Sequence, residues 1–247
     1  MNKNILIIGA SSGIAEAVAR RYASERCSFF LVGRSKSKLN VIAADLIARN
    51  ASSVSVCEWD ASNAAAFTSV ASEAWTVMHQ VDIALIAHGT LPDQVQAESD
   101  TAYALNHFEV NGVSAVTSMM VLAEQFSQQR NGVLAVIGSV AGDRGRQSNY
   151  LYGAAKAAVE ACASGLRARL HKVGCHVLLI KPGFVATAMT ANLDLPAVLT
   201  VSPDVVARDI QRAIERRRDV IYTPWFWRWI MLIIRWIPGV VFKRLSL

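Results

Sequence analysis

The sequence predicts a single α/β domain, in which a doubly wound parallel sheet carries helices on both faces, followed by an amphipathic C-terminal extension. Two observations lead to this prediction. Short apolar runs rich in β-branched residues alternate with amphipathic helical patterns, as in parallel sheets that are buried on both faces. The length of 247 residues and the hydrophobic content of 53% suit one well-packed domain and exclude a disordered chain.

The first unit is an apolar strand over 3–8, a turn over 9–13 and a helix marked by Ile14, Val18 and Tyr22. The same alternation then continues to the end of the domain. The expected later strands cover 28–32, 53–57, 82–87, 133–138, 175–180 and 220–222, and the expected later helices cover 36–50, 63–79, 101–130, 151–172 and 203–217. Because crossovers between parallel strands are right-handed, ligands are expected at the carboxyl edge of the sheet.

Composition excludes several classes of protein. The four cysteines lack the spacing of a zinc site or a disulfide framework, and no secretory signal precedes the first strand, so we expect a cytoplasmic protein without a metal site. The net charge is +6, and the segment from Pro203 onward holds nine Lys and Arg against four Asp and Glu. A nucleic-acid binder would spread its basic charge over a reading face, so we expect no nucleic-acid partner.

The turn after the first strand carries small residues at three positions, Gly9, Gly13 and Ala15. Glycine allows a tight turn and lets backbone N–H groups approach a pyrophosphate at a helix N-terminus. An ordinary strand-to-helix turn would show the same residues, but the place of this one in the first βα unit favours a Rossmann-type dinucleotide site. At the end of the second strand stands Arg34 rather than an acidic residue, which favours the 2′-phosphate of NADP(H), although Arg34 also fits a plain surface position.

Three residues form a candidate catalytic set. Ser139 closes the strand over 133–138, and Tyr152 and Lys156 lie four residues apart on the next expected helix, hence on one face. The ammonium group would lower the pKa of the phenol from about 10, which makes Tyr152 a usable acid or base for carbonyl chemistry. A Tyr and a Lys at this spacing are common on protein surfaces, so the pair alone is weak evidence for a catalytic site. The preceding serine and the nucleotide turn favour the catalytic interpretation.

With these residues in place, the chain resembles the short-chain dehydrogenase/reductase family over about residues 3–222. The resemblance rests on the 9–15 turn, Asp60, Asn111, Ser139, the Tyr152 and Lys156 pair, and the Pro182-Gly183-x-x-x-Thr187 motif. It implies an NADP(H)-dependent oxidoreductase acting on a small-molecule ketone, and a homo-oligomer formed through the long helices. It implies that Tyr152 donates the proton, Ser139 polarises the carbonyl, Lys156 holds the ribose and tunes Tyr152, and Asn111 positions a water.

The same resemblance implies a set of cofactor contacts, which are Gly9, Ser11, Ser12, Gly13, Ile14, Arg34, Asp60, Gly89, Tyr152, Lys156, Pro182, Gly183, Val185 and Thr187. Asp60 would contact the adenine and 182–187 the nicotinamide end. The sequence departs from the family pattern at Ala15 and at 86–89, where the usual Asn-Asn-Ala-Gly is Ile86-Ala87-His88-Gly89 and only the glycine remains. His88 would line the cofactor cleft or fill space, and the second explanation is preferred. Loops over 90–100, 142–149 and 186–202 are expected to shape the substrate pocket.

The C-terminal segment 224–247 differs from the reductase domain over 1–223. It holds four tryptophans, and its 13 residues from Trp225 to Ile237 would span only about 20 Å as a helix, too short to cross a bilayer. Arg228 and Arg235 fall nearly on one helical face, so residues 225–242 are predicted to lie on the inner surface of the cell membrane. Packing on the domain or on another subunit is the alternative.

This tail resembles the decaprenylphosphoryl-2-keto-erythro-pentose reductase branch of the family, which acts on lipid-linked keto-sugars, and it implies such a substrate held near the bilayer. Two other functions stay open: a soluble reductase of acyl-chain or small ketones whose tail contacts another subunit, and a non-catalytic NADPH-sensing module. The presence of Ser139 and Tyr152 argues against the sensor, because a pure binder needs neither.

Overall fold

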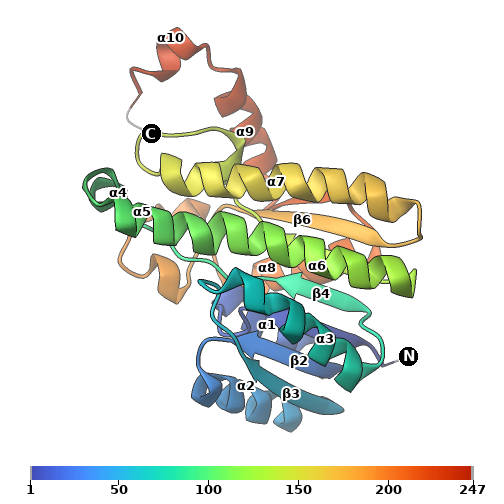
Figure 1. Cartoon of the computed structure of the whole chain (residues 1–247). Coiled ribbons are helices and arrows are strands. Elements are labelled where there is room, and N and C mark those ends of the chain that lie inside the picture. The colour runs from blue at the N-terminus through green and yellow to red at the C-terminus, as the bar shows by residue number, and fades with distance from the viewer. Residues whose placement is uncertain (1, 246–247) are drawn as a thin grey trace.

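The computed structural model describes residues 2–245, and these form a three-layer α/β arrangement with a projecting C-terminal extension (Figure 1). Seven parallel strands make the central sheet, in the order β3-β2-β1-β4-β5-β6-β9. They are β1 Asn4–Ile8, β2 Ser28–Gly33, β3 Ser53–Glu58, β4 Ile83–Ile86, β5 Val133–Ile137, β6 His176–Pro182 and β9 Val220–Thr223. Every strand predicted from the sequence is present, and the doubly wound fold is confirmed.

Helices cover both faces of the sheet because alternate strand side chains point to opposite sides. One face packs against α1 (Gly13–Ala23), α2 (Lys36–Ala48) and α8 (Pro203–Glu215). The other packs against α3 (Phe67–Met78), α6 (Ser114–Gln129) and α7 (Tyr150–His171), which stand in front of the sheet in Figure 1. Strand order reverses between β1 and β4, so the carboxyl ends of these strands open a crevice there.

The helix predicted over 101–130 is interrupted in the structure. It consists of α5 (Thr101–Phe108), a π-helical turn over Glu109–Val113 and α6, and a short helix α4 (Gln94–Ser99) precedes it. Asn111 lies in the π-helical turn and is buried. A π-helical turn of this kind often marks a functional position in a helix, and periodicity in the sequence does not reveal the extra residue.

A small second sheet lies in the connection between β6 and α8. It pairs β7 (Phe184–Val185) with β8 (Thr200–Val201), and short 3-10 turns over Ala188–Thr190 and Ala197–Leu199 fill the loop between them. A further 3-10 turn, η3 (Val140–Asp143), connects β5 to the segment that leads into α7. These irregular segments stand at the carboxyl edge of the sheet.

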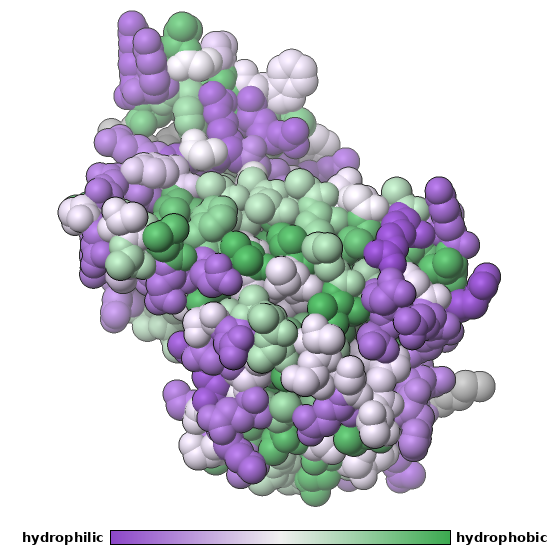
Figure 2. Space-filling model, in the orientation of Figure 1, coloured by the Kyte–Doolittle hydropathy of each residue, from purple (hydrophilic) through white to green (hydrophobic). Residues whose placement is uncertain are grey.

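The extension forms α9 (Trp227–Trp236) and α10 (Gly239–Phe242), which project beyond α7 at the top of Figure 1. Ser246 and Leu247 of the predicted extension lie outside the described residues. None of the helices within residues 2–245 has the length and apolar character needed to cross a bilayer. Figure 2 shows hydrophobic and hydrophilic residues side by side on this projection.

Candidate active site

The glycine turn after β1 is built for a close approach of backbone to a ligand. Gly9 has a φ of +79°, and a Cβ at this position would lie 2.5 Å from the backbone nitrogen of His88. A side chain is therefore excluded both by conformation and by space. Ser12 ends the turn as N-cap of α1, where its hydroxyl accepts the N–H of Ala15 at 3.3 Å. The turn thus points a helix N-terminus at the crevice, an arrangement that binds anions.

Basic side chains stand where β2 ends. Arg34 is exposed, and both Arg34 and Lys38 line the central cavity. Asp60 lines the same cavity and accepts hydrogen bonds from the backbone and hydroxyl of Ser62, both at 2.9 Å. These hydrogen bonds, with a smaller effect of the Arg34 charge, lower the pKa of Asp60. Lys38 was not predicted as a site residue.

Ser139, Tyr152 and Lys156 meet at the carboxyl edge as the sequence predicts. Ser139 follows β5 directly, and its Oγ accepts the N–H of Ala141 at 3.1 Å. Tyr152 lies in the first turn of α7, and Lys156 Nζ lies 5.7 Å from the centre of the Tyr152 ring. The Lys156 ammonium group donates to the carbonyl of Ile137 at 3.1 Å. Tyr150 points away and its hydroxyl donates to Glu98 at 3.1 Å.

The predicted direction of the Tyr152 pKa shift is wrong. Burial raises the pKa of Tyr152 to about 12, and the Ser139 side chain only partly offsets this. Burial also lowers the pKa of Lys156 to about 8. Loss of solvent disfavours both charged forms and outweighs their mutual attraction. The sequence argument counted the charge of Lys156 and left out the burial of the phenol.

One cavity of about 460 Å³ brings these elements together. All of the predicted site residues except Asn111 line it. These lining residues are Gly9, Ser11, Ser12, Gly13, Ile14, Arg34, Asp60, Gly89, Ser139, Tyr152, Lys156, Pro182, Gly183, Val185 and Thr187. Each of the three predicted pocket loops also reaches it, through residues such as Leu91, Arg146 and Met189. The size suits a small-molecule site.

Asn111 lies behind the cavity wall rather than in it. Its Oδ1 accepts the N–H of Thr90 at 2.8 Å, and its Nδ2 donates to the Thr90 hydroxyl at 3.0 Å and to the carbonyl of His107 at 2.9 Å. A Cβ on Gly89 would lie 2.9 Å from Asn111 Oδ1 and 3.7 Å from Lys156 Nζ. Glycine at position 89 therefore lets the side chains of Asn111 and Lys156 approach the same point.

His88 both lines the cavity and fills space between elements. Its Nε2 lies 3.1 Å from Ser114 Oγ, and its ring packs edge-on against Trp59. Burial, with a smaller effect of the Lys156 charge, lowers the pKa of His88 to about 3. The imidazole is therefore neutral near pH 7, and the two explanations offered by the sequence are not exclusive.

The base of the extension packs against this edge of the domain. Trp227 and Met231 are buried there with Val140, and a Cβ on Gly183 would fall on the Trp227 indole. Arg144 Nη1 donates to the carbonyls of Ile234 at 2.6 Å and Ile237 at 2.7 Å. The segment after Ser139 and the extension thus share one packed interface.

A buried ionic cluster supports the same segment. Lys181 Nζ binds the carboxylates of Asp143 and of Glu160, the latter at 2.8 Å, and Tyr222 donates its hydroxyl to Asp143 at 3.1 Å. These residues come from β6, η3, α7 and β9. No local pattern predicts this cluster, because its members are far apart along the chain.

Comparisons with known proteins agree with this architecture. Residues 3–196 match the family described as short chain dehydrogenase. An uncharacterised oxidoreductase of Mycobacterium tuberculosis is 35% identical over 241 residues, which are 98% of this chain and 96% of the relative. Another from Streptomyces coelicolor is 29% identical over 98% of this chain and 96% of the relative. A short-chain dehydrogenase from Sphingobium yanoikuyae in complex with NADPH shares the fold, with a TM-score of 0.83 and 24% identity over 94% of this chain and 92% of that one.

Proposed function

The chain belongs to the short-chain dehydrogenase/reductase family of oxidoreductases, and from this premise we propose that it is an NADPH-dependent reductase that transfers a hydride to a carbonyl group. One observation carries the proposal: Ser139, Tyr152 and Lys156 open onto the same cavity as the Gly9 turn. The cofactor site and the proton donor therefore face one another. A nicotinamide cofactor follows from the family, and the choice of NADPH is part of the proposal.

The chain's residues fit such a cofactor. The Gly9 turn leaves a cradle that a Cβ would fill, and the N-terminus of α1 would favour the pyrophosphate there. Arg34 and Lys38 line the adenosine end and form no ion pair within residues 2–245. Two free cations favour a 2′-phosphate over the bare ribose hydroxyls of NADH.

The protonation states of the cavity suit reduction. When bound, the cofactor supplies the hydride. Tyr152 stays protonated near pH 7 because its pKa is raised to about 12, so its hydroxyl can give a proton to the carbonyl oxygen. Ser139 Oγ already accepts the Ala141 N–H, so its own proton is free to donate to the same oxygen. Lys156 would hold the ribose hydroxyls beside them.

Replacing Tyr152 with phenylalanine tests the proposal. We expect NADPH oxidation with a panel of keto-sugars and cyclic or acyl-chain ketones to fall by about 10²–10⁴-fold, the usual contribution of a general acid. NADPH affinity, measured by fluorescence titration, should stay close to that of the unaltered protein. Activity retained by Tyr152→Phe on any of these substrates would overturn the assignment, and absence of activity in the unaltered protein would favour the NADPH-sensing alternative.

We further propose that the extension holds the enzyme at a membrane surface, where a lipid-linked keto-sugar is the substrate. Helix α9 has two apolar faces. Trp227 and Met231 face the domain, whereas Trp229, Ile233 and Trp236 are 55%, 67% and 81% exposed on the opposite side. Arg228 and Arg235 are also exposed, and Arg235 Nη1 lies 4.0 Å from Asp143 Oδ1 of the domain. Exposed tryptophan with flanking arginine is typical of helices that lie in the headgroup region.

Sedimentation with anionic vesicles tests the membrane contact. A chain ending at Thr223 would uncover the Trp227 site, so the sharper variant changes only exposed residues, Trp225, Trp229 and Trp236, to serine. We expect the unaltered protein to sediment with vesicles of phosphatidylglycerol and phosphatidylcholine, and the variant to stay in solution with its melting temperature unchanged. Equal sedimentation of both proteins, or of neither, would remove the support for a lipid substrate.

A soluble reductase is the second candidate, because the same outer face could contact another subunit. The α5 and α6 helices also expose apolar side chains, among them Leu105 at 65% and Met120 at 56%, and Figure 2 shows apolar residues gathered over α6 and α7. We propose that the face formed by α5 and α6 joins two copies of the chain. Light scattering on Met120→Arg tests it: a shift from dimer to monomer supports the proposal, and an unchanged mass overturns it.

A further inference from the structure

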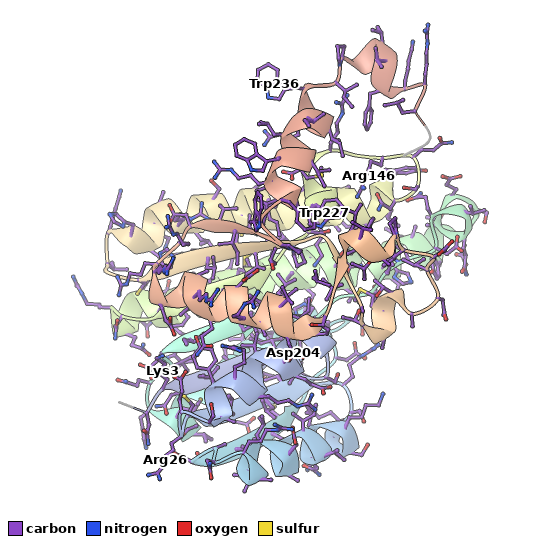
Figure 3. All side chains as sticks on the ribbon, turned by 180° about the vertical axis from the view of Figure 1, so that it is seen from behind. Lys3, Arg26, Arg146, Asp204, Trp227 and Trp236 are labelled. Carbon is purple, nitrogen blue, oxygen red and sulfur yellow. The ribbon has the colours of Figure 1, made fainter. Side chains whose placement is uncertain are left out.

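The turn that leads into α7 places two polar side chains in the cavity beside Ser139 and Tyr152. Arg146 and Asn149 both line the cavity, and Figure 3 labels Arg146 close to the base of the extension. The N–H of Asn149 donates to the carbonyl of Arg146 at 3.1 Å, so the two belong to one turn. This turn lies between the two residues proposed to contact the carbonyl oxygen.

Both side chains lack partners within residues 2–245. Arg146 Nε and Asn149 Oδ1 are buried and form no hydrogen bond, and Arg146 takes part in no ion pair. Asn149 stands at the N-cap of α7 without capping it. A guanidinium without a partner in a partly desolvated site is unfavourable, so such a group is normally matched by an anion.

The carboxylates that could neutralise Arg146 are engaged elsewhere. Asp143, three residues before it, binds Lys181 and Tyr222, and Glu160 binds Lys181. Burial lowers the pKa of Arg146, and the charge of Asp143 opposes this only in part. Within residues 2–245, therefore, no carboxylate pairs with Arg146 at this end of the cavity.

The cavity that Arg146 lines also has apolar side chains in its wall. Leu91, Val140, Phe184, Met189 and Leu193 line the cavity with it. Arg34 and Lys38 are the basic residues proposed to meet the cofactor phosphates. They belong to a different segment, which follows β2. One cation and one amide amid apolar side chains match a ligand that carries an anionic group next to a hydrocarbon part.

We propose that Arg146 and Asn149 form a subsite for an anionic group, a phosphate or a carboxylate, carried by the ketone substrate. This inference rests on the proposed reductase function and adds a substrate class to it: an amphiphilic ketone with its charge close to the reacting carbonyl. The planar guanidinium suits bidentate contact with either anion. Asn149 Nδ2 can donate to the same anion, whereas its unpartnered Oδ1 is an acceptor and would receive a hydroxyl of the ligand. A lipid phosphate and a soluble keto acid share this chemistry.

Binding of simple amphiphiles to the NADPH-saturated protein tests the subsite. The probes are decyl phosphate, decanoate and decanol, below their aggregation concentrations, followed by isothermal calorimetry. We expect decyl phosphate or decanoate to bind at least about 30-fold more tightly than decanol, as for loss of a buried charge partner. Preference for decyl phosphate assigns a phosphate-bearing substrate, and preference for decanoate assigns a keto acid. Equal binding of decanol overturns the proposal.

Arg146→Met is the main variant, because it keeps the length of the side chain and removes the charge. It should weaken binding of the preferred anion by about 30-fold, whereas Arg146→Lys should keep part of it. Arg212→Met is the control, since Arg212 is exposed on α8 and forms no ion pair within the described chain. Binding by Arg146→Met within about threefold of the unaltered protein overturns the proposal.

Melting temperature and NADPH affinity separate this subsite from a structural role and from the proposed function. Removing an unpaired charge should leave the melting temperature unchanged or higher, and NADPH affinity unchanged. A clear fall in melting temperature for both Arg146→Met and Arg146→Lys would show that Arg146 supports the fold, and would overturn the proposal. If the unaltered protein does not bind NADPH, the reductase function fails first, before the anion is tested.

Discussion

Replacing Trp227 with alanine should detach the extension from the domain and lower stability. The indole is 3% exposed and packs against Phe184 with ring centres 5.0 Å apart. A buried tryptophan removes roughly 200 Å² from water, which at about 25 cal/mol/Å² corresponds to about 5 kcal/mol. Its buried Nε1 has no partner, which costs about 1–3 kcal/mol in the unaltered protein. The net loss of unfolding free energy is therefore about 2–4 kcal/mol.

Differential scanning calorimetry with a matched control measures this loss. For a domain of this size, about 2–4 kcal/mol lowers the melting temperature by about 5–15 °C. Trp236→Ala makes the same change on the same helix at a side chain that is 81% exposed, and should shift it by about 2 °C or less. Trp227→Phe removes the unpaired N–H and should lose less than Trp227→Ala. Equal shifts for Trp227→Ala and Trp236→Ala would refute the docked position of α9.

Four further predictions concern the cavity. Arg34→Glu should weaken NADPH binding by about 100-fold and leave NADH binding nearly unchanged; equal losses for the two cofactors in fluorescence titrations would contradict the 2′-phosphate assignment. Because burial lowers the pKa of Lys156 to about 8, kcat/KM for carbonyl reduction should fall above about pH 8, and a profile flat to pH 10 would argue against a role for its charge. For the same reason Lys156 binds more protons in the unfolded than in the folded chain between pH 8 and 10.5, so Lys156→Met should make the slope of unfolding free energy against pH less positive across that window in denaturant titrations. Gly9→Ala meets a φ of +79° and a backbone atom at 2.5 Å, so it should abolish NADPH binding, and near-normal affinity would show that the turn can relax.

Local patterns explain why the sheet and most of the cavity could be predicted from the sequence. A continuous apolar run of strand length predicts a buried strand. A tyrosine and a lysine four residues apart on a helix share one face of it. The glycine turn is likewise constrained within a few residues. Each of these signals is complete in a short stretch of chain, so no knowledge of tertiary contacts is needed.

The features that sequence reasoning missed depend on contacts between distant segments. Lys181, Asp143 and Glu160 form one cluster only after β6, η3 and α7 are packed. The raised pKa of Tyr152 depends on burial that no local pattern records. Arg146 could have been noticed, as an arginine between Ser139 and Tyr152, but its lack of a partner is visible only in three dimensions.

The arginine that caps the extension has a consequence for how this protein can change over evolutionary time. Arg144 holds the final carbonyls of α9 and stacks at 3.6 Å on the ring of Phe242, yet it belongs to the segment between the two proposed acid and carbonyl-polarising groups. Gly183, in the segment proposed to meet the nicotinamide, leaves the space that Trp227 occupies. The extension is therefore not a portable module. A recombination event that transferred the extension to another reductase would also have to transfer Arg144 and Gly183 of the catalytic domain.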